Sequence, residues 1–312
     1  MLDKMLKTLK TKKTRNILLV IILAIASVLY LLADRYLIEH VEGKAILATE
    51  SGATIPETAS NLESDDWNYK SDNITININK VQTGQGNDTV TYFVADVQLS
   101  DSSSLKSAFA KDEYGRNIVE KTSQIAADNN AIFARNGDYY GFRSDGVLIR
   151  NGVLFRDKPA RIAAALYKNG TMQAFDETDV SSSSLLADGV LHTLSFGPVL
   201  IKNGAVVENF DRVSVDSNFG NRAIQGSNPR TGIGMISANH YVFVVVDGRM
   251  ANYSKGMTLS EFADVFADLG CTEAYNLDGG GSSTMYFMDR VVNNPAGKQD
   301  ERAISDILYI KG

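Results

Sequence analysis

Three Asn-Gly pairs, each set between two apolar runs, constrain the fold of this chain more than any other feature. They lie at 151–152, 169–170 and 203–204. Asn-Gly readily takes positive φ at both central positions of a type I′ turn, which joins two antiparallel strands. Residues 74–79 alternate isoleucine with polar residues, and residues 90–99 form a second β-rich run. The pattern therefore predicts a fold built mainly from antiparallel hairpins.

Helices are predicted at two places among these strands. Thr258 and Glu261 form a capping box, Gly270 marks a C-terminal stop, and the apolar residues between them recur on one helical face. A second, short helix is predicted over 105–111, after a run of serines. Residues 241–246 are continuously apolar, as in a strand buried on both faces. The resulting fold class is α+β, with helices packed on antiparallel hairpins.

The N-terminal region contains a segment that is long and apolar enough for a membrane. Residues 17–33 carry no charge and, as a helix rising about 1.5 Å per residue, reach roughly 25 Å. Basic residues precede it and favour a cytoplasmic N-terminus. We expect an uncleaved single-pass type II anchor in the cell membrane, with the body of the protein extracellular. The alternative is a signal peptide cleaved near the small residues Ala24 and Ala26.

The chain is thus predicted to have four parts. They are a basic cytoplasmic tail at 1–16, a transmembrane anchor at 17–38, a stem at 39–61 and one folded domain at 62–312. The stem is assigned because that segment mixes small, polar and acidic residues without periodicity. The domain is taken as single because no linker composition interrupts it.

Charge and cysteine content exclude several classes of protein. Residues 1–16 hold six basic residues and one acidic residue, so the chain's net charge of −6 leaves −11 for the rest. Such an acidic body argues against a nucleic-acid partner. The single cysteine, Cys271, cannot form an intramolecular disulfide and is expected to be a small buried side chain. The histidines are scattered, with no zinc-ligand spacing.

The strongest candidate for a functional site is the run 275–285. In this run Asp278 is followed by three glycines, Gly279 to Gly281, and then by the hydroxyls of Ser282 and Ser283. Consecutive glycines suggest backbone that approaches another group closely or adopts positive φ. Asp278 could then serve as a general base, a nucleophile or an ion ligand. The alternative is a tight turn in which Asp278 only caps backbone amides.

Three further polar segments lie at predicted strand ends, at 135–140, 228–234 and 247–249. Polar groups at strand ends are positions where a rigid scaffold can hold catalytic loops. The arginines at 230 and 249 have the planar fork that suits phosphate or carboxylate. Simple turns remain the alternative for the Asp-Gly and Asn-Gly pairs in these segments. A serine hydrolase is disfavoured because no Gly-x-Ser-x-Gly elbow is present.

With these motifs in this order, the chain resembles the phosphodiester glycosidase family over roughly residues 122–312. The matching stretches are 136–140, 197–204, 228–234, 246–249 and 276–283. The stretch containing Asp278 is the most specific of them. One departure is Asp138, at a position where relatives frequently have glycine.

This resemblance implies hydrolysis of a sugar-1-phosphodiester at the anomeric carbon. It implies Asp278 as the principal carboxylate, with Asp247 or Asp138 as the second, and Arg230 and Arg249 as the phosphate clamp. The remaining predicted substrate-binding residues are Asn136, Thr231, Gly279, Gly280, Gly281, Ser282 and Ser283. The expected partner is a phosphodiester-linked carbohydrate or glycopolymer of the cell envelope, in addition to the membrane that holds the helix.

Two alternatives stay open at this point. A non-catalytic module that binds carbohydrate or scaffolds polymer assembly would also use a glycine loop, without an activated carboxylate. No cofactor is expected to be required, but Ca²⁺ or Mg²⁺ could be held by hard oxygen ligands from Asp278, Asp247 and Asn136.

Overall fold

The computed structural model describes residues 12–44, 62–213, 215, 224–298 and 300–312. Four α-helices lie within this part of the chain: α2 (Lys12–Tyr36), α3 (Thr122–Asp128), α4 (Ser182–Ala187) and α5 (Leu259–Asp268). The paired strands of this part run antiparallel to their neighbours. The predicted α+β fold of mainly antiparallel strands is confirmed.

Two large sheets make up most of the domain. The nine-stranded sheet has the order β15 (Ala205–Val206), β14 (Val199–Lys202), β18 (Glu273–Leu277), β16 (Arg230–Ser237), β17 (His240–Val246), β5 (Val90–Leu99), β4 (Ile74–Thr83), β3 (Asn68–Lys70) and β2 (Glu63–Ser64). The five-stranded sheet has the order β20 (Arg290–Val291), β19 (Met285–Phe287), β8 (Ala131–Asn136), β21 (Asp306–Lys311) and β6 (Leu105–Phe109).

Three smaller sheets complete the strand pairing. One is three-stranded, with the order β12 (Met172–Asp176), β11 (Ile162–Tyr167) and β13 (Val190–Leu194). The others are the hairpin of β9 (Leu148–Arg150) with β10 (Val153–Arg156), and the pair of β1 (His40–Lys44) with β7 (Glu113–Arg116).

The two large sheets pack face to face, with a helix on each outer face. The main core cluster joins Phe243 of β17 and Tyr275 of β18 to Phe133 and Leu308 of the five-stranded sheet. A second cluster lies between the other face of the nine-stranded sheet and α5, and a third between the five-stranded sheet and α3. The domain is therefore layered as helix, sheet, sheet and helix.

Helix α5 packs unusually close to the sheet because β16 presents glycines beneath it. A Cβ atom on Gly232 would lie 2.9 Å from the ring of Phe262, and one on Gly234 would lie 2.7 Å from the ring of Phe266. The helix begins at the predicted capping box, where Thr258 Oγ1 accepts from the backbone amide of Glu261 at 3.2 Å. The two glycines of β16 thus allow the close packing of α5 on the sheet.

All three Asn-Gly pairs join antiparallel strands, as predicted. Asn151 and Asn203 both have positive φ, as do the glycines that follow them, which is the type I′ conformation. In the third pair only Gly170 has positive φ, and the side chain of Asn169 instead accepts from the backbone amide of Thr171 at 3.0 Å.

The helix predicted over 105–111 is wrong: Leu105–Phe109 is strand β6, which pairs with β21. Long-range pairing with the C-terminal strand overrides the local helical preference. The predicted polar cap exists, but it closes a single 3₁₀ turn, where Asp101 accepts from the backbone amide of Ser103 at 2.8 Å.

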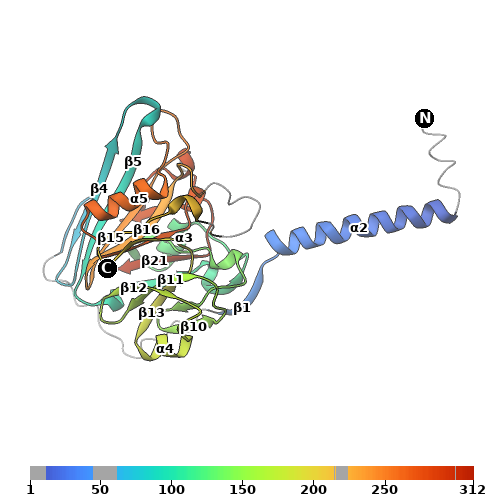
Figure 1. The fold of residues 1–312 in the computed structure, drawn as a ribbon, viewed down its shortest axis with the longest axis horizontal. Helices are drawn as coiled ribbons and strands as arrows, with labels where there is room; N and C mark the ends of the chain where they lie inside the picture. Colours follow the sequence, from blue (N-terminus) through green and yellow to red (C-terminus); the bar gives the residue numbers. More distant parts are fainter. Residues whose placement is uncertain (1–11, 45–61, 214, 216–223, 299) are drawn as a thin grey trace.

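An apolar helix precedes the domain, as predicted. An 18-residue window within its span 15–36 has a mean hydropathy of 2.7, and none of that window is buried. The helix projects away from the domain (Figure 1). These properties are typical of a membrane anchor or a signal sequence.

The chain joins the domain directly after this helix. Strand β1 pairs with β7, and the Asn117 side chain donates to the carbonyls of Asp34 and Ile38 at 3.0 and 2.8 Å. Residues 40–44 of the predicted stem are therefore part of a sheet, while residues 45–61 lie outside the described residues.

Candidate functional site

The register of the nine-stranded sheet gathers the predicted site residues at one edge. Thr231 lies opposite Leu277, and Arg230 lies opposite Val246. Because β16 runs antiparallel to both neighbours, its first residue emerges where β17 and β18 end. Asp278 follows β18 at this edge, and Asn136 ends β8 in the facing sheet.

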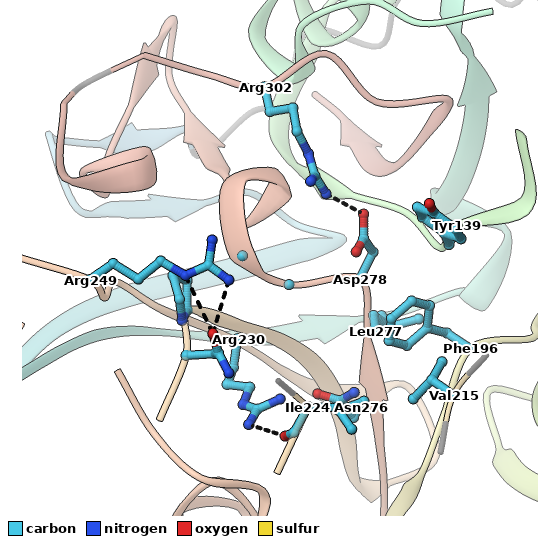
Figure 2. Close-up of a pocket in the computed structure, with 14 residues that line it drawn as sticks. Tyr139, Phe196, Val215, Ile224, Arg230, Arg249, Asn276, Leu277, Asp278 and Arg302 are labelled. Carbon is cyan, nitrogen blue, oxygen red and sulfur yellow. Dashed lines mark hydrogen bonds and ion pairs between the residues drawn. The ribbon is translucent and has the colours of Figure 1, made fainter. Parts of the chain in front are cut away.

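A pocket of about 210 Å³ opens at this edge, and all four polar segments contribute to it. Its lining residues are Tyr139, Phe196, Val215, Ile224, Asn228, Pro229, Arg230, Arg249, Asn276, Leu277, Asp278, Gly279, Gly280 and Arg302. Asp278 is the only carboxylate among these described lining residues, whereas three of them are arginines. The pocket therefore combines one acid with a cationic rim (Figure 2).

Asp278 is held in place by two partners. Its Oδ2 accepts from Ser282 Oγ at 2.7 Å and pairs with Arg302 Nη2 at 3.0 Å. The carboxylate side chain is only 13% exposed. Burial raises the pKa of Asp278 above the ordinary value of a carboxyl group, while Arg302 and the Ser282 hydroxyl oppose that rise.

Arg302 is the charged site residue that the sequence did not reveal. It lies between η7 (Pro295–Gly297) and β21, in a segment without a recognisable motif. Its Nε donates to Ser282 Oγ at 3.0 Å, and the guanidinium spans from this hydroxyl to Asp278. Since half of the side chain is exposed, it can contact both the carboxylate and an incoming ligand.

The glycine loop brings bare backbone against the arginines and a neighbouring carbonyl. A Cβ atom on Gly279 would lie 2.6 Å from the Pro229 carbonyl oxygen, so a side chain cannot fit there. Gly280 has a φ of +63°, and its open face lies beneath the guanidinium of Arg249. The loop is thus a compact turn on which cationic side chains can lie.

The two predicted phosphate-binding arginines differ in how they are held. Arg249 is exposed, and its guanidinium donates to the Asn228 side chain, with Nη2 at 2.9 Å from Oδ1. Arg230 is buried, with Nε bound to the Met257 carbonyl and Nη2 to the carbonyls of Ile224 and Gly226. Burial, with Arg249 nearby, lowers the pKa of Arg230 to about 10. Arg249 is the better placed of the two to bind an anion.

The other predicted substrate-binding residues support the pocket from behind. Asn136 Nδ2 donates to the backbone carbonyl of Asp278 at 2.8 Å, and its Oδ1 accepts from Thr231 Oγ1 at 3.0 Å. Gly281 packs against the stem of Arg302, and Ser283 is buried. These residues join the two sheets and fix the loop that carries Asp278.

The two other predicted carboxylates, Asp247 and Asp138, do not line the pocket. Asp247 is buried and accepts from Tyr253 Oη at 2.8 Å, Asn293 Nδ2 at 2.8 Å and the backbone amide of Asn294 at 2.9 Å. Burial raises its pKa above the ordinary value. Its contacts are those of a structural acid that ties together the loops beside the pocket.

Asp138 is buried behind the pocket wall. It accepts from the backbone amides of Tyr140 and Ser195 and forms an ion pair with Arg150 at 3.2 Å. Although burial alone would raise its pKa, Arg150 and these amides hold the pKa below the ordinary value. Neither predicted second carboxylate lines the pocket with Asp278.

The residues suggested as metal ligands all have oxygens that accept hydrogen bonds within the protein. The Asn136 oxygen accepts from Thr231 and from the backbone amide of Thr284, and Asp247 and Asp278 are bound as described above. Among the described residues, no group of three or more His, Cys, Asp or Glu side chains gathers as for a metal ion.

The fold and the site together define a two-sheet antiparallel domain with a single-carboxylate, arginine-lined pocket. A family model for phosphodiester glycosidases matches residues 129–311, more than half of the chain. The chain belongs to the phosphodiester glycosidase family.

Individual relatives are distant. The SPbeta prophage-derived uncharacterized protein YomE of Bacillus subtilis (strain 168) is 28% identical over 198 residues, which are 62% of this chain and 29% of that protein. This chain therefore spans less than a third of that relative's length.

Two solved structures show the same fold. The catalytic domain of zebrafish N-acetylglucosamine-1-phosphodiester alpha-N-acetylglucosaminidase, auto-inhibited by its pro-peptide, has a TM-score of 0.61 at 20% identity and covers 81% of this chain and 88% of its own. A hypothetical protein from Synechocystis has a TM-score of 0.57 at 14% identity and covers 81% of this chain and 64% of its own.

Proposed function

We propose that this protein hydrolyses a sugar-1-phosphodiester, breaking the bond between the anomeric carbon and a phosphate oxygen. The observation that supports this most is that one largely buried carboxylate, Asp278, shares a pocket with the guanidinium groups of Arg249 and Arg302. The substrate would belong to a cell-envelope glycan or glycopolymer, reached from a membrane anchor on the extracellular side.

The single carboxylate matches the chemistry of this substrate. Ordinary glycoside hydrolysis uses two carboxyl groups, one of which protonates the leaving oxygen. A phosphate monoester is already a good leaving group, so it departs without that acid. The arginines would stabilise the charge that develops on the phosphate as the bond breaks.

Asp278 would act on the other side of the reaction. Its carboxylate would accept a proton from an attacking water, or stabilise positive charge at the anomeric carbon. The water oxygen bonds to that carbon as the carbon–oxygen bond to phosphate breaks, releasing free sugar and a phosphomonoester. Ser282 and Arg302 fix the orientation of the carboxylate for this role.

Hydrolysis of a panel of sugar-1-phosphate alkyl esters by the full chain in detergent micelles tests the proposal. We expect release of free sugar with phosphomonoester, and a loss of about 10²-fold or more in Asp278→Asn. Asp264→Asn, on the exposed surface of α5, is the matched control and should keep full activity. Activity that survives Asp278→Asn would refute the assigned role.

A non-catalytic carbohydrate-binding or scaffolding role is the second candidate. It is favoured by the absence of a second carboxylate from the described pocket lining and by the ion pair that already engages Asp278. A folded chain that binds the panel without turning any member over would support this candidate and overturn the hydrolase.

A further inference from the structure

We propose that the pocket has two subsites on opposite sides of Asp278, a sugar subsite walled by Tyr139 and Phe196 and a phosphate subsite at Arg249. This assignment rests on the proposed function, which makes the ligand a sugar-1-phosphodiester. It adds the orientation of that ligand in the pocket. Figure 2 shows the two aromatic side chains on one side of Asp278 and Arg249 on the other.

The aromatic wall, formed by Tyr139 and Phe196, is held in place by contacts within the protein. The rings of Tyr139 and Phe196 meet edge to face with centroids 6.2 Å apart, and Phe142 stacks on Tyr139 at 4.9 Å. The guanidinium of Arg143 lies 5.2 Å from the Tyr139 centroid and 4.9 Å from that of Phe196. Arg143 also donates to the Ser195 carbonyl at 3.0 Å, so the wall is fixed before a ligand arrives.

The chemistry of the two sides decides which part of the ligand each takes. A pyranose ring carries a face of C–H groups, which packs on aromatic rings and removes apolar surface from water. A phosphate group would lose hydration against the ring faces, which offer it no hydrogen-bond donor. Arg249 offers a charged, exposed fork to phosphate oxygens. The glycosidic bond of a ligand lying this way would cross the pocket beside Asp278.

Asp138 is the positioning residue for the sugar side. Its Oδ1 accepts from the backbone amide of Tyr140 at 2.9 Å, next to Tyr139 in the chain. Its Oδ2 accepts from the backbone amide of Ser195 at 3.0 Å, next to Phe196. One buried carboxylate thus joins the two loops that carry the wall.

Equilibrium binding of two separate probes tests the assignment without requiring turnover. The probes are inorganic phosphate and a panel of free hexoses and N-acetylhexosamines, measured by ligand-observed NMR with the full chain in detergent micelles. Tyr139→Leu and Phe196→Leu remove a ring but keep an apolar side chain. We expect each to weaken sugar binding by about tenfold and to leave phosphate binding unchanged. Arg249→Gln should weaken phosphate binding and spare the sugar.

Asp138→Asn keeps a similar shape but loses the charge that pairs with Arg150. Because Asp138 positions only the loops of the aromatic wall, Asp138→Asn should weaken sugar binding while phosphate binding stays at the wild-type level. A general loss of structure would weaken the binding of both probes. Aromatic variants that leave sugar binding intact, or that weaken both probes equally, would overturn the two-subsite assignment. Selective loss of sugar binding in a chain that hydrolyses nothing would support the subsites and reject the hydrolase.

Discussion

Replacing Arg302 by glutamine separates the electrostatic role of this arginine from simple ligand binding. Burial raises the pKa of Asp278, and the Arg302 guanidinium, with Nη2 at 3.0 Å from Oδ2, opposes that rise. Catalysis by Asp278 needs the ionised carboxylate, so activity falls as the pH drops through its raised pKa. Glutamine removes the charge while keeping a hydrogen-bond donor, and the acidic limb of the pH–rate profile should therefore move to higher pH.

The size of this movement follows from the exposure of the pair. The Arg302 side chain is 52% exposed, so water screens the interaction well below its strength in a dry interior. A value of about 1 kcal/mol is reasonable for such a half-exposed pair. Since 1.36 kcal/mol corresponds to one pH unit, the limb should rise by about 0.7.

The assay is the pH dependence of kcat/KM for a sugar-1-phosphodiester, measured for wild type and variant under the same ionic strength. Arg249→Gln is the matched control, because Arg249 lines the same pocket but bonds Asn228 rather than Asp278. The control should lose rate across the profile without moving its acidic limb. An acidic limb that stays in place or moves to lower pH in Arg302→Gln would refute the assigned role of the pair.

Four further results are expected. Thr258→Ala removes the cap of α5 and should cost about 1 kcal/mol of stability in urea unfolding, whereas exposed Ser260→Ala should cost less. Gly232→Ala places a methyl group against Phe262 and should cost about 1–3 kcal/mol by the same measurement. Asp247→Asn should lower the melting temperature while leaving KM unchanged, since its carboxylate is bound to neighbouring loops. Turnover should survive a chelator, and loss restored by Ca²⁺ or Mg²⁺ would contradict this.

Local chemistry made much of the fold predictable. Asn151-Gly152 and Asn203-Gly204 adopt the turn that their residue types favour, and Thr258 caps a helix because the reciprocal partner lies three residues away. The prediction for residues 105–111 was wrong because the strand there, β6, pairs with β21, which lies about two hundred residues further along the chain. Pairing of this kind leaves no trace in a short window of sequence.

The site residues likewise fall into those that the local sequence predicts and those that only the tertiary fold reveals. Asp278 could be predicted because its glycine neighbours are a local signal, and the convergence of Arg230 and Arg249 follows from strand ends. Arg302 has no such signal, because only the tertiary fold places its guanidinium beside Asp278. Asp138 looks the same in sequence whether it faces a ligand or a buried arginine, and only its contacts distinguish the two.

The pairing of β1 with β7 also sets where the chain can be shortened without harm. In the described residues β1 is the only strand paired with β7, so removal of everything before residue 62 would leave β7 as an open edge. Such edges recruit strands from other molecules and promote aggregation. It would also take away the carbonyls that Asn117 binds. A secreted or crystallisable version of this protein should therefore keep its residues from Asp34 onward, with the part of α2 before Asp34 removed.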